Sequence, residues 1–135
     1  MYIDDRISNY LEQIVQKNGL TLIHIDGTEL DPDVANGRKR AIIINNNYKT
    51  TFSRYFRIAH EISHLIYTRS NDTYAFSPLS KLSDETEANL HAIQILVDFY
   101  FSEIPLKQER WERRFHFIEA FGLGQITHLV EKILA

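Results

Sequence analysis

The chain shows two kinds of hydrophobic pattern, one typical of helices and one of strands. Apolar residues recur every three to four positions in five segments, and this spacing predicts helices over residues 5–18, 51–68, 83–101, 106–120 and 124–134. Two short apolar runs, 21–25 and 40–44, predict strands. Outside these elements, residues 31–39 are expected to form turns and residues 70–81 a polar loop, because both stretches contain proline.

The ends of the predicted elements carry the expected boundary residues. Gly19 follows the first helix as a stop signal. Ser83 is a candidate N-cap, with acidic residues just after it, where the helix dipole favours anions. The chain of 135 residues is therefore expected to form one α+β domain over residues 1–135, in which a small twisted sheet packs against a mainly helical body.

The composition narrows the kinds of chemistry that are available. Hydrophobic residues make up 44% of the chain and charged residues 24%, as in an ordinary globular protein. The absence of cysteine excludes a disulfide framework or a thiolate metal site, so His and carboxylate must hold any metal ion. A net charge of −3 argues against non-specific nucleic-acid binding. With no membrane-length apolar run and no signal-peptide pattern, we expect a cytoplasmic protein without a membrane partner.

The segment HEISH, which runs from His60 to His64, is the most informative motif. Two histidines four positions apart lie one turn above each other on a helix, so both imidazoles can hold one metal ion. Here they fall at the rim of the apolar face, where a cleft can open. Glu61 lies beside that ion and can take a proton from a water that the ion polarises, as in zinc-dependent peptidases. The same residues also fit a solvated helix face, because this short motif arises by chance in some chains.

A catalytic zinc ion needs a third protein ligand and one open position. On the helix predicted for residues 83–101, Glu85 lies centrally on the apolar stripe with Asn89 one turn along, whereas Glu87 points to the polar side. A carboxylate on an apolar stripe is costly to bury without a partner, so the pattern favours Glu85 over Glu87 as the ligand. Asn89 is placed to steady a ligand histidine. The alternative is an acidic helix start that the dipole stabilises, which fits both glutamates equally well.

Taken in order, these residues make the chain similar to the ImmA/IrrE family of metallopeptidases. The likeness covers residues 40–96 and consists of an apolar strand ending in asparagine (AIIINNN), the segment RYFRIAHEISH and the segment ETEANLHA. Ser63 stands where the family often has glycine, and ILVDFYF replaces the family's usual proline-containing end of the glutamate helix. By this resemblance, His60, His64 and Glu85 would be the metal ligands. Glu61 would be the catalytic base or acid, and Asn89 an outer-shell group.

The resemblance implies a zincin-like fold and a small regulatory protease of a bacterium, phage or other mobile element. We expect a zinc-dependent endopeptidase, with Mn²⁺ or another divalent ion as alternative cofactor. Its protein substrate would be a helix-turn-helix repressor whose cleavage derepresses mobile-element or stress genes, with no direct nucleic-acid contact. The strand over residues 41–44 is a candidate edge for pairing with an extended substrate.

Two alternatives to the enzyme remain at this point. One is a non-catalytic metal-binding interaction module that retains the metallopeptidase scaffold. The other is a metal-stabilised domain with no partner in its cleft. An intact Glu61 favours the enzyme, because a purely structural metal site does not need a base beside the ion.

Overall fold

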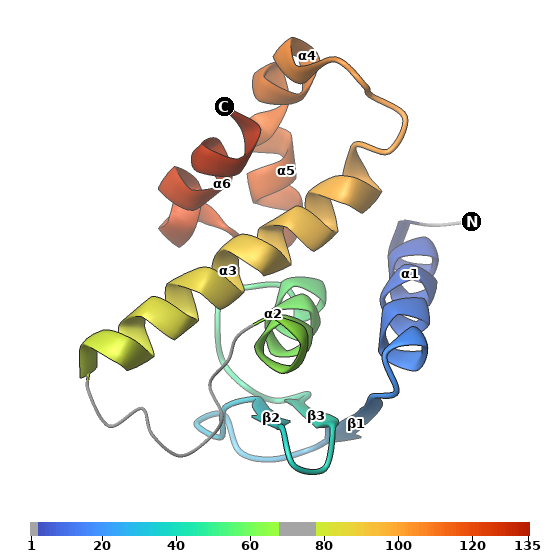
Figure 1. Cartoon of the computed structure of the whole chain (residues 1–135), viewed down its shortest axis with the longest axis vertical. Helices are drawn as coiled ribbons and strands as arrows, with labels where there is room; N and C mark the ends of the chain where they lie inside the picture. The colour runs from blue at the N-terminus through green and yellow to red at the C-terminus, as the bar shows by residue number, and fades with distance from the viewer. Residues whose placement is uncertain (1–2, 68–77) are drawn as a thin grey trace.

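The computed structural model describes residues 3–67 and 78–135 of the chain, and it confirms the α+β class (Figure 1). In the N-terminal half a helix precedes the three strands and another follows them, and the C-terminal half is helical. The elements in chain order are α1 (Ile3–Lys17), β1 (Thr21–Ile25), β2 (Val34–Asn36), β3 (Ala41–Asn45), α2 (Arg54–Ile66), α3 (Pro78–Tyr100), α4 (Lys107–Glu112), α5 (Arg114–Phe121), the 3₁₀ turn η1 (Gly124–Ile126) and α6 (Thr127–Leu134).

The sheet is mixed, with the strand order β1-β3-β2. β1 pairs parallel with β3, from Thr21 opposite Ala41 onward. β2 pairs antiparallel with β3, with Val34 opposite Ile43. β3 therefore has a neighbour on each side, and the prediction that residues 41–44 form a free edge for a substrate was wrong. The edge next to the helix that carries HEISH is β2.

β2 lies within residues 31–39, which the sequence predicted to be turns only. Three residues are too short to show the alternation by which a strand is recognised, so this strand is defined by its pairing with β3. Arg40, predicted to begin the next strand, instead closes the turn after β2 with a left-handed φ of 53°. Its guanidinium donates to the carbonyls of Leu65 and Asn18, at 3.3 and 2.9 Å, and so ties this turn to α2 and to the residue that follows α1.

α3 begins at Pro78, five residues before the predicted N-cap Ser83. Proline is well suited to the first turn of a helix, since its missing N–H has no partner there in any case and its φ is already helical. Ser83 lies inside the helix and is exposed. The remainder of the predicted loop, residues 70–77, lies outside the described residues, as does the predicted end of the preceding helix at Thr68.

The helices and the sheet stack in layers around one core (Figure 1). α2 lies between the sheet and α3, and the C-terminal helices pack on the far side of α3. α1 packs against α2 and β1. The helix predicted over residues 106–120 is two helices, because the backbone at Arg113 (φ −98°, ψ 10°) leaves the helical region. The largest fully buried side chains are those of Phe56, Phe101, Phe117, Ile7, Leu11, Ile42, Ile44, Ile62, Ile93, Leu96, Leu123 and Val97.

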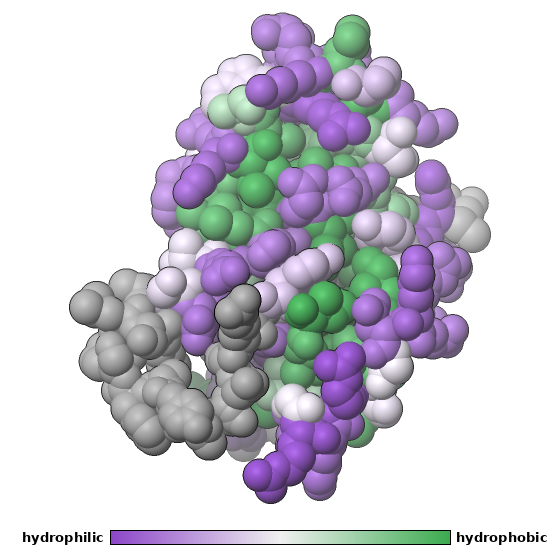
Figure 2. Space-filling view, viewed as in Figure 1, coloured by the Kyte–Doolittle hydropathy of each residue, from purple (hydrophilic) through white to green (hydrophobic). Residues whose placement is uncertain are grey.

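The face of the molecule seen in Figure 2 is mostly polar. On the face seen in Figure 2, hydrophilic residues dominate the outline, and hydrophobic residues show between them over the C-terminal helices. Within residues 3–67 and 78–135, none of the helices combines the length and the apolar character that crossing a bilayer requires.

Candidate metal centre

α2 presents the HEISH motif at the edge of its buried face. The helix starts at the N-cap Ser53, whose Oγ accepts a hydrogen bond from the amide of Phe56 at 3.1 Å. Its buried residues face the sheet and α3, and the side chains of His60 and His64 are only 14% and 18% exposed. The predicted position of both histidines at the rim of the apolar face is confirmed. The buried residues of the helix are Phe56, Ile58, Ala59, Ile62 and Ser63.

α3 packs against α2 and brings Glu85 onto the two histidines. The Oε2 atom of Glu85 lies 3.0 Å from Nε2 of His60, and Oε1 lies 3.1 Å from Nε2 of His64. The two Nε2 atoms are 3.1 Å apart. One carboxylate thus spans two imidazoles, and the three donor groups converge on one point between the helices.

This donor set fits a zinc ion. Two ligand atoms at about 2.0–2.1 Å from a tetrahedral zinc are about 3.3 Å apart, close to the 3.0–3.1 Å that separates these atoms. Two imidazole nitrogens and one carboxylate oxygen also match the His₂Glu set of catalytic zinc sites, which leaves a fourth position open. Among the described residues, His60, His64 and Glu85 form the group of His and acidic side chains close enough together to hold a metal ion.

The other predicted residues are placed as follows. Glu87 is exposed, as predicted, and lies outside this group; its carboxylate is instead 4.0 Å from Nε2 of His91. Glu85 is less buried than its place on the apolar stripe suggested, since its side chain is 44% exposed against 51% for Glu87. The two glutamates therefore differ in direction rather than in burial. Within residues 3–67 and 78–135 the side chain of Asn89 makes no hydrogen bond, and its outer-shell role stays a prediction.

The acidic residues of α3 do not owe their place to the helix dipole. Because the helix begins at Pro78, its first turn contains no acidic residue, and Glu85 and Glu87 lie beyond it. The favourable effect of a helix N-terminus on anions falls off within the first turn. The alternative explanation by a stabilised helix start therefore loses its basis, and the contacts of Glu85 with the histidines take its place.

The charges of Glu85 and His64 stabilise each other. Hydrogen bonds from His60 and His64 hold the pKa of Glu85 far below its ordinary value, although burial acts in the opposite direction. For His64, burial lowers the pKa, but the hydrogen bond to Glu85 and the charges of Glu85 and Glu61 outweigh it, so the net pKa lies above the ordinary 6.5. Nδ1 of His60 is buried and has no hydrogen-bond partner in the described part of the chain.

Glu61 is in a different electrostatic setting from Glu85. Burial raises the pKa of Glu61 above its ordinary value, and the charges of Asp33 and Glu85 raise it further. The charges of His60 and His64 oppose this shift. A partly buried carboxyl beside a metal site with a raised pKa is suited to accept a proton and give it back.

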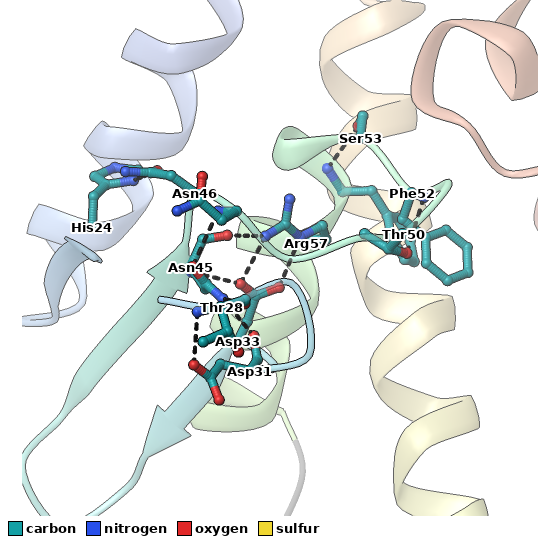
Figure 3. A network of polar contacts seen from close by, with 12 residues as sticks. His24, Thr28, Asp31, Asp33, Asn45, Asn46, Thr50, Phe52, Ser53 and Arg57 are labelled. Carbon is teal, nitrogen blue, oxygen red and sulfur yellow. Dashed lines mark hydrogen bonds and ion pairs between the residues drawn. The ribbon is translucent and has the colours of Figure 1, made fainter. Parts of the chain in front are cut away.

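A buried polar network, which was not predicted from the sequence, lies beside the site (Figure 3). Arg57 of α2 donates from Nε and Nη2 to the carboxylate of Asp33 at 2.8 and 2.9 Å, and from Nη2 to the carbonyl of Asn45 at 2.7 Å. The side chain of Asn45, fully buried, accepts from the amide of Gly27 and donates to the carbonyls of Thr28 and Asp31. The asparagine that ends the apolar strand was part of the family likeness, but its partners are distant in sequence.

Comparison with known proteins agrees with this site. The family model described as the IrrE N-terminal-like domain, Peptidase_M78, matches residues 15–124, which include the whole histidine–glutamate group. Neither a curated protein nor a solved structure matches the chain significantly. Since the match covers most of the chain and contains the three converging side chains, the protein belongs to the ImmA/IrrE family of peptidases.

Proposed function

We propose that this protein is a zinc-dependent endopeptidase. The observation that carries the proposal is the convergence of His60, His64 and Glu85 on one point with Glu61 beside them. His₂Glu with an open position is the ligand set of catalytic rather than purely structural zinc sites. The family membership supports hydrolysis of a peptide bond as the reaction.

Each protein group has a separate task in this mechanism. His60, His64 and Glu85 would hold the ion, with Glu85 supplying the negative charge of the set. When bound, zinc supplies Lewis acidity that lowers the pKa of a water molecule and polarises the scissile carbonyl. The Glu61 carboxylate accepts the proton of the attacking water and returns it to the nitrogen of the leaving amine.

The substrate would approach along the edge of the sheet. β2 is the edge strand beside α2, so its outward backbone groups can pair with an extended peptide. This replaces the segment 41–44, which lies in the centre of the sheet. We further propose a helix-turn-helix repressor as the protein substrate, in line with the resemblance noted above, so that cleavage releases mobile-element or stress genes.

The test uses the purified chain, zinc and the repressor encoded nearest to its gene. We expect fragments of the repressor, identified by mass spectrometry, that depend on added zinc and disappear with a chelator. Cleavage by the Glu61→Gln variant at the rate of the parent would refute the mechanism. Binding of the repressor without cutting, under conditions in which another metallopeptidase cuts a control peptide, would favour the non-catalytic interaction module.

A further inference from the structure

The ion pair between Asp33 and Arg57 joins the edge strand of the sheet to the helix of the site (Figure 3). Asp33 directly precedes β2, and Arg57 lies on α2, three residues before His60. The pair is bidentate, at 2.8 and 2.9 Å, with the two side chains only 6% and 12% exposed. A buried fork of this kind fixes both distance and orientation, unlike a flexible surface ion pair.

Both side chains of the ion pair make additional contacts with neighbouring residues. The amide of Asn45 donates to Oδ1 of Asp33 at 2.9 Å, and the carbonyl of the same residue accepts from Arg57. The guanidinium also lies over the ring of Tyr48, 5.6 Å from its centroid. Because each charged group has several fixed neighbours, neither can shift without breaking other interactions.

The turn after β2 is also tied to the same helix, because the guanidinium of Arg40 donates to the carbonyl of Leu65 at 3.3 Å. Gly37, just after β2, lies near the same residue, since a Cβ atom placed on it would come 4.0 Å from Cδ2 of Leu65. Residues 57 to 65 advance about 12 Å along a helix, and residues 33 to 37 advance about 13 Å along a strand. The two segments therefore match in length, and Glu61 falls midway along α2 between Arg57 and Leu65. The stripe of α2 that carries Glu61 runs alongside the edge strand.

We propose that Asp33 and Arg57 are positioning residues, which set the place of the β2 edge relative to Glu61 and His60. This inference rests on the proposed function. A peptide paired with β2 takes its position from that strand, whereas the ion and the base take theirs from α2. The ion pair is a buried, bidentate link between the two, so it helps to set where the scissile carbonyl of an extended substrate lies.

Arg57→Lys tests the link, because lysine keeps the positive charge but cannot form the two-pronged contact. A displacement of about 1 Å at a reacting group can lower a rate about 10²-fold. We therefore expect kcat per bound metal ion to fall by about 10–10²-fold for an extended peptide, with KM little changed. A short peptide that spans only the cut bond and does not reach β2 should keep its kcat. A merely structural role would lower the two rates together.

Arg114→Lys is the matched control. Arg114 pairs with Glu131 through one contact, at 2.9 Å, that joins α5 to α6 away from the site. This control should leave the ratio of the two rates at the parent value. If Arg57→Lys does not fold, Asp33→Asn replaces it, since the amide keeps the shape and an acceptor for Asn45 but removes the charge. Equal loss for both peptides in the folded variant would overturn the proposal.

A second measurement does not depend on cleavage. With Co²⁺ in place of zinc, paramagnetic shifts of backbone amides report their position relative to the ion. Arg57→Lys should change the shifts of Ala35 and Asn36 in β2 and leave those of Ile93 and Leu96 in α3 unchanged. Unchanged β2 shifts would overturn the positioning role. If the parent binds Co²⁺ but cuts neither peptide, the peptidase proposal fails while these shifts still decide the inference. A parent that binds no Co²⁺ overturns both.

Discussion

Oε2 of Glu85 lies 3.0 Å from Nε2 of His60, and this contact joins α3 to the middle of α2. Glu85→Ala removes the carboxylate from the proposed ligand set, so the variant should lose its metal. Glu87→Ala is the matched control, because Glu87 is similarly exposed and lies outside the group of His60, His64 and Glu85. Elemental analysis of both purified variants checks this. Metal loss from the Glu87 variant alone would reverse the assignment.

The role of Glu61 is separable from metal binding. Glu61→Gln keeps the size of the side chain and its hydrogen-bonding capacity, but it cannot accept a proton at neutral pH. Metal occupancy should stay at the parent level, while repressor cleavage falls by about 10²–10⁴-fold. His60→Ala, in contrast, should lose metal and activity together. The comparison requires cleavage rates and metal content from the same preparations.

The site was predictable to the extent that it follows from helical periodicity. His60, His64 and Glu61 are fixed relative to one another by the helix alone, so their spacing correctly placed His60 and His64 at the rim of the buried face of α2. Glu85 was found by the direction in which α3 presents it. The reason given for it, burial on an apolar stripe, was only partly right, because its side chain is 44% exposed.

The features that could not be predicted from the sequence depend on contacts between residues that are distant along the chain. β2 exists because Val34 pairs with Ile43, and three residues carry no periodicity of their own. Likewise, Asp33 and Arg57 are 24 positions apart, and nothing in the local pattern distinguishes them from surface charges. The early start of α3 has a different cause, since proline indicates a loop in many contexts but Pro78 occupies the first turn of this helix, which also suits proline.

Ser63 is a test of packing within α2. Its side chain is completely buried, and its hydroxyl donates to the carbonyl of Ala59 at 2.8 Å, within the helix itself. Ser63→Gly should therefore fold and cost no more than about 1 kcal/mol, the usual penalty of glycine inside a helix. Ser63→Leu should overpack the space and lower the free energy of unfolding by about 1–3 kcal/mol. Chemical denaturation of the three proteins checks this, and a leucine variant as stable as the parent would contradict it.

The pH dependence of stability should differ between the metal-free and zinc-bound protein. In the metal-free chain the pKa of His64 is raised above 6.5, mainly by Glu85 acting against burial. The stabilisation from protonated His64 is therefore fully present below about pH 6.5 and is lost as the pH rises through the raised pKa. The depressed pKa of Glu85 adds stabilisation that is present above 4.5 and is lost only in stronger acid.

The interaction of His64 with Glu85 should accordingly give the metal-free protein a larger free energy of unfolding at about pH 6 than at about pH 8. Glu85→Gln should remove most of that difference, because it removes the charge that holds the proton on His64. Zinc should act in the opposite direction, since a ligand histidine must be neutral and protons compete with the ion. The stabilisation by zinc should thus be larger at about pH 8 than at about pH 6. Denaturation curves with and without zinc at both pH values give the two trends, and a zinc effect that grows on acidification would exclude His64 from the ligand set.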